Sequence, residues 1–201
     1  MAKLIFNYGV MKSGKSLDLI RTFTNYQHKG QVPLVLKSSV DTRDDKIKTR
    51  MGGEIFCELL GPNDFITDYL SEDRREHPPV ILIDEAQFLT PHQILALTIC
   101  VDKYNIDVIC YGLKLDYTGR FFEGSKILFE EADKLQEIKM LCAFCDKKAT
   151  HNILTELKED GYRYCCDTGT GSNIKIGDED YFQCCRNHFY FYNNRRNRLV
   201  F

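Results

Sequence analysis

The chain has 201 residues, 43% of them hydrophobic, a formal net charge of −2 and nine cysteines. This length allows one main core and a small additional domain, and the charge gives no general basic field, which argues against a nucleic-acid partner. The sequence has no apolar run long enough to cross a bilayer and no signal peptide, so we expect a cytoplasmic protein without a membrane partner. An odd cysteine count in a reducing compartment favours metal ligands or free thiols over disulfides.

Short β-rich runs alternate with helical stretches through the first two thirds of the chain, which predicts an α/β fold with a mostly parallel sheet. Strands are expected at residues 3–8, 32–37, 80–83 and 108–111, and helices at 15–29, 64–70 and 91–102. The first helix should turn Leu17, Ile20, Phe23 and Thr24 to one side. Residues 111–125 are rich in glycine and aromatic side chains, which suits a shaped loop.

The composition of the sequence changes near Met140. Beyond this point cysteines cluster, apolar runs shorten and turn residues accumulate. We therefore predict a core domain over residues 1–139 and a smaller domain with a C-terminal tail over residues 140–201.

A glycine-rich motif, GVMKSGKS, lies between the first predicted strand and the first predicted helix. It fits G-x-x-x-x-G-K-[ST], in which successive backbone N–H groups wrap a phosphate at a helix N-terminus. Its lysine would reach the β- and γ-phosphates, and its last serine would bind Mg²⁺. The alternative is a glycine-rich turn with an incidental Lys-Ser pair. The motif predicts an ATP site that includes Gly9, Val10, Met11, Lys12, Ser13, Gly14, Lys15 and Ser16.

Two carboxylates follow the apolar run at residues 80–83, where a strand of such a sheet would end beside the ligand crevice. Asp84 is expected to bind Mg²⁺ together with Ser16, and Glu85 could accept a proton from an attacking hydroxyl. Alternatively, both acids simply leave the sheet for solvent. The segment is predicted to extend the ATP site through Asp84, Glu85, Ala86 and Gln87.

A charged segment, DTRDD, follows the second predicted strand. Here Arg43 could stabilise charge on the transferring phosphoryl group together with Lys15, while Asp41 supports the metal ion or Arg43. A solvated loop of charged residues explains the same composition equally well.

Cysteine pairs near the end of the chain have the spacing of a structural zinc site. Cys142 and Cys145 form a C-x₂-C pair, and the segment CCRNH lies about forty residues later. Choosing Cys185 with His188 gives the same two-residue spacing on both sides, whereas Cys184 would give a three-residue step. Cys165 and Cys166 could compete, but adjacent cysteines poorly suit one ion. The predicted ligands are Cys142, Cys145, Cys185 and His188.

These motifs together resemble the type II thymidine kinases over nearly the whole chain. The phosphate loop, DTR and DEAQF occur in the family's order, and YGLKLDYTGRFFEGS is similar to its long signature Y-G-L-R-x-D-F-x-G-x-x-F-x-G-S. The C-x₂-C pair, IGDEDY and CRNH resemble the zinc-bearing segment of bacterial and phage members. Lys114 departs from the usual arginine and Tyr117 from the common phenylalanine.

The resemblance implies a P-loop kinase core followed by a zinc-bearing lasso domain that closes over a nucleoside. It implies that Glu85 is the general base for the 5′-hydroxyl of thymidine, with ATP as donor. It further implies deoxyuridine as a second substrate, thymidine triphosphate as a feedback inhibitor and a homotetramer. The residues expected around the nucleoside are Met11, Phe88, Leu113, Tyr117, Phe122, Ile174, Lys175, Ile176, Gly177 and Tyr181.

Two other functions share part of this pattern. A P-loop ATPase or helicase-like motor would have both nucleotide motifs but needs a basic groove, which the composition does not supply. A nucleic-acid binding module without catalysis would have no use for an intact phosphate loop beside Glu85.

Overall fold

The computed structural model describes residues 1–40, 45–166, 180–195 and 199. Its contacts divide the chain into two compact units, which are described separately below. The α/β unit consists of Met1–Tyr8, Gly14–Gly112 and Phe122–Glu137. The cysteine-rich unit consists of Gly9–Ser13, Leu113–Phe121 and Ile138–Phe201. Among the described residues, no helix has the length and apolarity needed to cross a membrane.

The α/β unit is built on a six-stranded sheet with the order β5-β2-β6-β7-β1-β8. Strand β2 pairs in parallel with β5 and β6, and β6 pairs in parallel with β7. The strands are β1 Leu4–Gly9, β2 Leu34–Ser38, β5 Glu58–Leu60, β6 Val80–Asp84, β7 Asp107–Leu113 and β8 Lys134–Ile138. A small antiparallel hairpin adds β3 Lys46–Lys48 and β4 Glu54–Phe56. The predicted mixed α/β fold with a mostly parallel sheet is confirmed.

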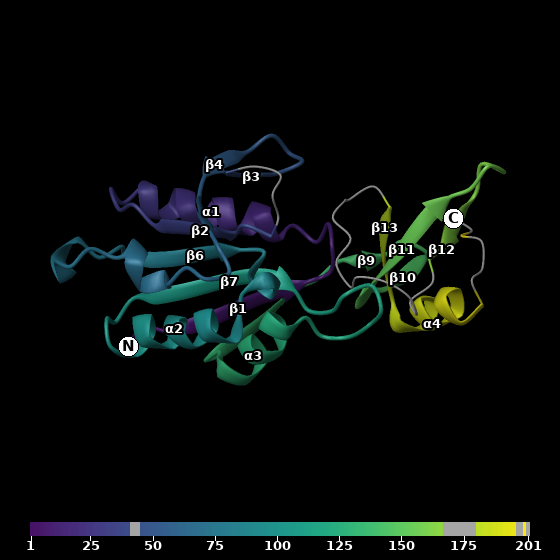
Figure 1. The fold of residues 1–201 in the computed structure, drawn as a ribbon. Helices are drawn as coiled ribbons and strands as arrows, with labels where there is room; N and C mark the ends of the chain where they lie inside the picture. The colour runs from purple at the N-terminus through teal and green to yellow at the C-terminus, as the bar shows by residue number, and fades with distance from the viewer. Residues whose placement is uncertain (41–44, 167–179, 196–198, 200–201) are drawn as a thin grey trace. The chain divides into compact units, whose positions relative to one another are not determined.

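Helices cover both faces of this sheet (Figure 1), with α1 on one side and α2 and α3 on the other. The helices on each side shield one face of the apolar strands from water, which is the general reason for layered α/β architectures. The helices are α1 Lys15–Gln27, α2 Pro91–Asp102 and α3 Glu123–Glu131, and the short 3₁₀ turns are η1 Ile66–Tyr69, η2 Arg74–Glu76 and η3 Ala86–Phe88.

Helix α2 begins where its sequence predicts. Thr90 caps it by accepting a hydrogen bond from the Gln93 amide, the Gln93 side chain returns a bond to the Thr90 amide, and Pro91 occupies the first turn. This reciprocal arrangement satisfies donors that a helix N-terminus otherwise leaves unpaired. The Gln93 side chain also donates to the Gly61 carbonyl at 2.7 Å, which ties α2 to the segment after β5.

Three sequence expectations need correction. Helix α1 buries Leu19 completely, whereas Leu17, expected on the packed side, is 44% exposed. The segment expected to form a helix at 64–70 contains only the 3₁₀ turn η1. The stretch expected as a loop at 111–125 ends inside α3, whose buried residues Gly124, Ser125 and Leu128 include two that carry little apolar surface. Helix α3 therefore escaped detection by hydrophobic periodicity.

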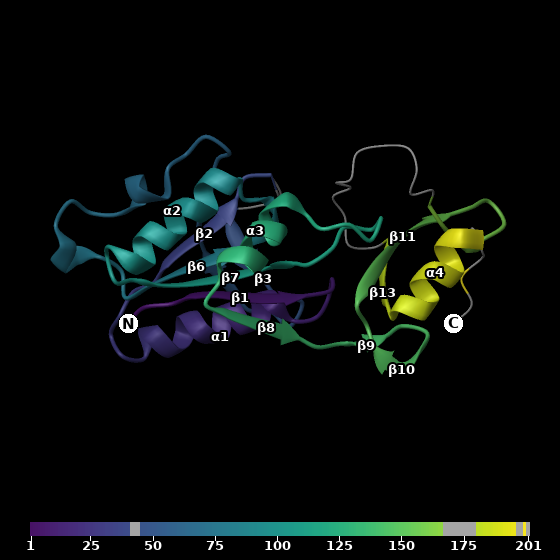
Figure 2. The same ribbon diagram turned by 90° about the horizontal axis from the view of Figure 1, so that it is seen from below.

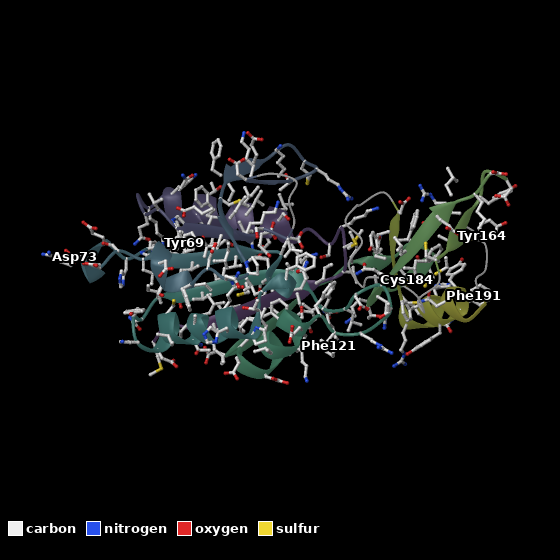
Figure 3. The ribbon with its side chains drawn as sticks, in the orientation of Figure 1. Tyr69, Asp73, Phe121, Tyr164, Cys184 and Phe191 are labelled. Atoms are coloured by element: carbon white, nitrogen blue, oxygen red, sulfur yellow. The ribbon has the colours of Figure 1, made fainter. Side chains whose placement is uncertain are left out.

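In its described residues, the cysteine-rich unit contains a three-stranded antiparallel sheet, a two-stranded ribbon and one helix (Figure 2). Its sheet has the order β12-β11-β13, with Leu154 of β11 opposite Tyr181 of β13. Cys184 lies within the interior cluster of this unit, whereas Phe191 of the helix is 46% exposed (Figure 3). The elements are β9 Leu141–Cys142, β10 Cys145–Lys148, β11 His151–Leu157, β12 Arg163–Cys165, β13 Tyr181–Cys184 and α4 Arg186–Arg195.

Candidate functional site

The phosphate-loop motif connects β1 to α1, as its sequence predicts. Gly14, the residue before the helix, has φ +91°, a left-handed conformation that a side chain disfavours. Lys15 and Ser16 then open α1, and the side chain of Lys15 is buried. The loop therefore places a lysine and a hydroxyl in the first helical turn, where backbone N–H groups lack intrahelical acceptors and the helix dipole favours an anion.

The first half of the loop has partners within the cysteine-rich unit. The Met11 amide donates to Asn152 Oδ1 at 2.9 Å, and the Lys12 ammonium donates to the Tyr181 carbonyl at 3.0 Å. The motif predicts that successive backbone N–H groups from Gly9 to Lys15 can wrap a phosphate. In the structure the Met11 amide is bound to Asn152.

Asp84, in the acidic segment, is hydrogen-bonded to the phosphate loop. Its Oδ2 accepts a hydrogen bond from Ser16 Oγ at 3.4 Å, although the two residues are 68 positions apart in the sequence. Its other oxygen, Oδ1, is buried without a hydrogen-bond partner in the described part of the chain. Burial raises the pKa of Asp84 to about 7, the charge of Glu85 acts in the same direction, and Lys15 and Lys37 lower it.

A divalent cation fits this arrangement chemically. Mg²⁺ prefers oxygen ligands, and it would give the orphaned carboxylate oxygen a partner and the buried carboxylate a counter-charge. Ser16 and Asp84 are therefore the residues that could hold the metal ion expected with ATP.

Glu85 is held in an unusual conformation directly after β6. Its φ is +52° and its ψ is +37°, and its Oε2 accepts a hydrogen bond from Gln87 Nε2 at 2.5 Å. Left-handed geometry is uncommon for a glutamate and persists where surrounding structure enforces it. The carboxylate thus has one oxygen engaged by Gln87 and a second, Oε1, with which it could accept a proton.

Two glycines of the signature motif make room for Gln87, which is only 2% exposed. A Cβ at Gly112 would lie 2.9 Å from Gln87 Oε1, and one at Gly124 would lie 2.8 Å from the Gln87 carbonyl oxygen. Both distances are too short for a real side chain. Residues 111–125, predicted as a loop, therefore pack closely against the acidic segment. The glycines of this stretch could have suggested such a close approach.

The residues expected around a nucleoside fall into two groups. In the α/β unit, the rings of Phe88 and Phe122 meet edge to face with centroids 5.6 Å apart. In the cysteine-rich unit, the ring centroids of Tyr117 and Tyr181 lie 6.5 Å apart. Met11 packs against the cluster that these two tyrosines form with Leu154. Leu113, the last residue of β7, is half-buried. Leu154 and Asn152 were not recognised in the sequence because they lie outside every motif.

Several predicted residues lie outside the described part of the chain. They are Asp41, Arg43, Ile174, Lys175, Ile176 and Gly177.

The predicted metal ligands come together in the cysteine-rich unit. One ligand atom from each of Cys142, Cys145, Cys185 and His188 can be chosen so that all four lie within 4.8 Å of one another. Cys145 Sγ is 3.9 Å from Cys185 Sγ, and His188 Nδ1 is 3.5 Å from Cys142 Sγ and 3.4 Å from Cys185 Sγ.

The three individual distances are close to the edges of a tetrahedral zinc site. A Zn–S bond of about 2.3 Å implies an S···S edge of roughly 3.8 Å, and shorter Zn–N bonds imply an S···N edge of roughly 3.5 Å. Thiolates and an imidazole are also the donors that zinc prefers. Cys184 lies in the same interior cluster outside the four, and burial raises the pKa of its thiol. The cluster could therefore hold a structural zinc ion without Cys184.

Replacing Cys185 with serine is expected to remove most of the bound zinc, whereas the same change at Cys184 should leave it in place. Serine is a poor zinc ligand, and at Cys184 it removes only a buried thiol. Metal analysis of the two purified variants measures the difference. Zinc retained by Cys185→Ser and lost from Cys184→Ser would overturn the ligand assignment.

Comparison with known proteins gives a consistent family relationship. A sequence model of the family described as "Thymidine kinase" matches residues 2–189. A thymidine kinase of Streptococcus thermophilus is 38% identical over 203 residues, covering 100% of this chain and 98% of the relative. Thymidine kinases of Zymomonas mobilis and Enterobacteria phage T4 are 40% and 39% identical over 192 residues, each covering 94% of this chain and 96% of the relative.

Proposed function

This chain belongs to the thymidine kinase family, and we propose that it transfers the γ-phosphate of ATP to the 5′-hydroxyl of thymidine. The products are ADP and thymidine 5′-monophosphate, a precursor for DNA synthesis obtained by salvage. The observation that carries the phosphoryl-transfer chemistry is the hydrogen bond between Ser16 and Asp84, which joins the phosphate loop to the acidic segment. Deoxyuridine, which keeps the same base edge, is the second substrate in this proposal.

The phosphate loop and the acidic segment have different roles in binding ATP and its metal ion. Backbone donors at the start of α1 and the Lys15 ammonium bind the phosphates, and Lys15, with Arg43, stabilises charge that develops on the transferring group. Ser16 and Asp84 would hold Mg²⁺, which when bound would neutralise negative charge on the phosphates. The burial of Lys15 and Asp84 strengthens these electrostatic interactions, because water screens them less.

Glu85 acts as the general base in this proposal. Its carboxylate takes the proton of the 5′-hydroxyl as that oxygen attacks phosphorus, and the bond between the β-phosphate oxygen and the γ-phosphorus breaks. The Gln87 hydrogen bond supports the role, because it restrains one carboxylate oxygen and leaves the other for the substrate. The aromatic pair Phe88 and Phe122 offers flat apolar surface of the kind that a pyrimidine base prefers.

The remaining roles rest on family resemblance and on the cysteine cluster. Zinc at the four ligands has a structural role, because a site with four protein ligands leaves no open position for a reacting water. By the family resemblance, the segment from residue 140 onward has the role of the lasso domain, and residues 174–177 and Tyr181 have the role of nucleoside-binding residues. Thymidine triphosphate inhibits by competing with thymidine, and the active form is a homotetramer in the cytoplasm.

A panel of nucleosides tests this function. With ATP and Mg²⁺, we expect phosphorylation of thymidine and deoxyuridine and at least a ten-fold lower kcat/KM for deoxycytidine. A site that hydrogen-bonds the 4-oxo, N3–H edge of thymine meets a reversed donor and acceptor pattern in cytosine. Each group left without a hydrogen-bond partner weakens binding by roughly 1–3 kcal/mol. Product formation is followed by chromatography of the monophosphates.

The same assay separates the alternatives. Equal kcat/KM for thymidine and deoxycytidine would refute the proposed base recognition. ATP hydrolysis that is independent of nucleosides but stimulated by DNA would replace the kinase assignment with a nucleic-acid motor.

A further inference from the structure

The amide of Met11, in the phosphate loop, has a side-chain partner from a distant strand. It donates at 2.9 Å to the side-chain oxygen of Asn152, a residue 141 positions later in β11. Asn152 is 3% exposed, so its amide group is a buried polar group. A buried side-chain oxygen that accepts a backbone N–H fixes the position of that backbone, because breaking the bond leaves both groups unsatisfied.

Lys12, the next residue, has its own attachment to the same small sheet. Its ammonium donates to the Tyr181 carbonyl at 3.0 Å and lies 5.5 Å from the centre of the Phe182 ring. Tyr181 and Phe182 begin β13, which pairs with β11 through Leu154↔Tyr181 and Ile153↔Phe182. The loop is thus attached to two adjacent strands by two consecutive residues.

The backbone at this point needs restraint. Lys12 has φ +64°, a left-handed conformation that is disfavoured for a lysine by roughly 1 kcal/mol or more. The two attachments lie on Lys12 itself and on the residue before it. They can therefore hold the loop in a conformation that its own sequence does not favour.

We propose that Asn152 is a positioning residue for the ATP phosphates, which acts by fixing the Met11 amide and thereby the first half of the phosphate loop. The inference rests on the proposed function for the identity of the ligand. An anchored loop presents the remaining N–H donors in a fixed arrangement before ATP arrives, so less ordering entropy is lost on binding.

A leucine at position 152 tests the anchor, because it has the same number and branching of side-chain heavy atoms as asparagine and no hydrogen-bond acceptor. In Asn152→Leu we expect hydrogen exchange of the peptide covering residues 9–13 to become faster in the protein without nucleotide. We also expect the Kd for Mg·ADP and the KM for ATP to rise about 3- to 10-fold, the effect of one lost hydrogen bond. The KM for thymidine should change less than the KM for ATP.

Gln183→Leu provides the matched control. Gln183 pairs with Asn152 across β11 and β13, its side chain is half-buried, and in the described part of the chain it makes no hydrogen bond with residues 9–13. The same amide-to-leucine change there should leave exchange of the loop and the KM for ATP within about two-fold of wild type. Zinc content and melting temperature of both variants show whether the fold is intact.

The outcomes are decisive in either direction. Unchanged exchange and unchanged Mg·ADP affinity in a folded, zinc-loaded Asn152→Leu protein overturn the proposal, as does tighter nucleotide binding. If Asn152→Leu does not fold, Lys12→Met removes the second attachment, and faster exchange of residues 9–13 supports the anchor whereas unchanged exchange rejects it. A wild-type protein that fails to phosphorylate thymidine refutes the proposed function, but the exchange experiment still tests the anchor.

Discussion

Replacing Glu85 with glutamine is expected to lower kcat for thymidine phosphorylation by about 10²- to 10⁴-fold, the usual contribution of a general base. Glutamine keeps the size of the side chain, and its carbonyl oxygen can still accept the hydrogen bond from Gln87 Nε2. Glutamine can adopt the left-handed backbone conformation of Glu85 as readily as glutamate does, since the two side chains have the same branching. The variant loses only the ability to take a proton, so the Kd for Mg·ADP should stay within about three-fold.

Steady-state kinetics and calorimetric titration with Mg·ADP measure the two effects separately. Glu130→Gln, the same change at an exposed position in α3, serves as the control and should retain wild-type kcat. Wild-type turnover in Glu85→Gln would remove Glu85 from the reaction. A large loss of Mg·ADP affinity would show instead that the residue holds nucleotide.

Local patterns in the sequence predicted the parts of the site that depend on local geometry. The five residues of β6 are all buried, and the first four, residues 80–83, were predicted as a buried strand because both faces of a covered parallel strand are apolar. The spacing of Cys142, Cys145, Cys185 and His188 likewise predicted a cluster that the structure brings together, because two-residue spacing suits two ligands of one ion.

Other parts depend on contacts that no local pattern encodes. The bond from the Met11 amide to Asn152 joins residues 141 positions apart, and an asparagine in a short strand has no distinctive signature. In α1, periodicity favoured Leu17 over Leu19, although the packed side is set by where the sheet lies. Helix α3 was missed because glycine and serine fill buried positions beside the acidic segment, where space excludes larger side chains.

Replacing Asp84 with asparagine should separate activity from stability. Loss of the carboxylate removes a proposed Mg²⁺ ligand, and kcat/KM should fall on the order of 10²- to 10³-fold, since metal stabilisation of the transition state is worth several kcal/mol. The protein without Mg²⁺ should nevertheless become more stable at neutral pH. A buried carboxylate with one unpartnered oxygen is costly to ionise, and asparagine has nearly the same shape without the charge.

The pH dependence of this gain has a definite sign. The pKa of Asp84 rises from 3.8 to about 7 on folding, so the folded wild-type protein holds its proton more tightly than the unfolded chain does. Wild-type stability therefore falls as the pH rises from about 4 to about 7 and is constant above, whereas the variant lacks this loss. The gain in Tm, measured in EDTA, should be several degrees at pH 8 and less than half of that at pH 5. Asp102→Asn, at an exposed position in α2, should show little change at either pH. A gain that is larger at pH 5 than at pH 8 would contradict the buried, cation-dependent carboxylate inferred here, because only an acid with a raised pKa destabilises the fold increasingly as it ionises.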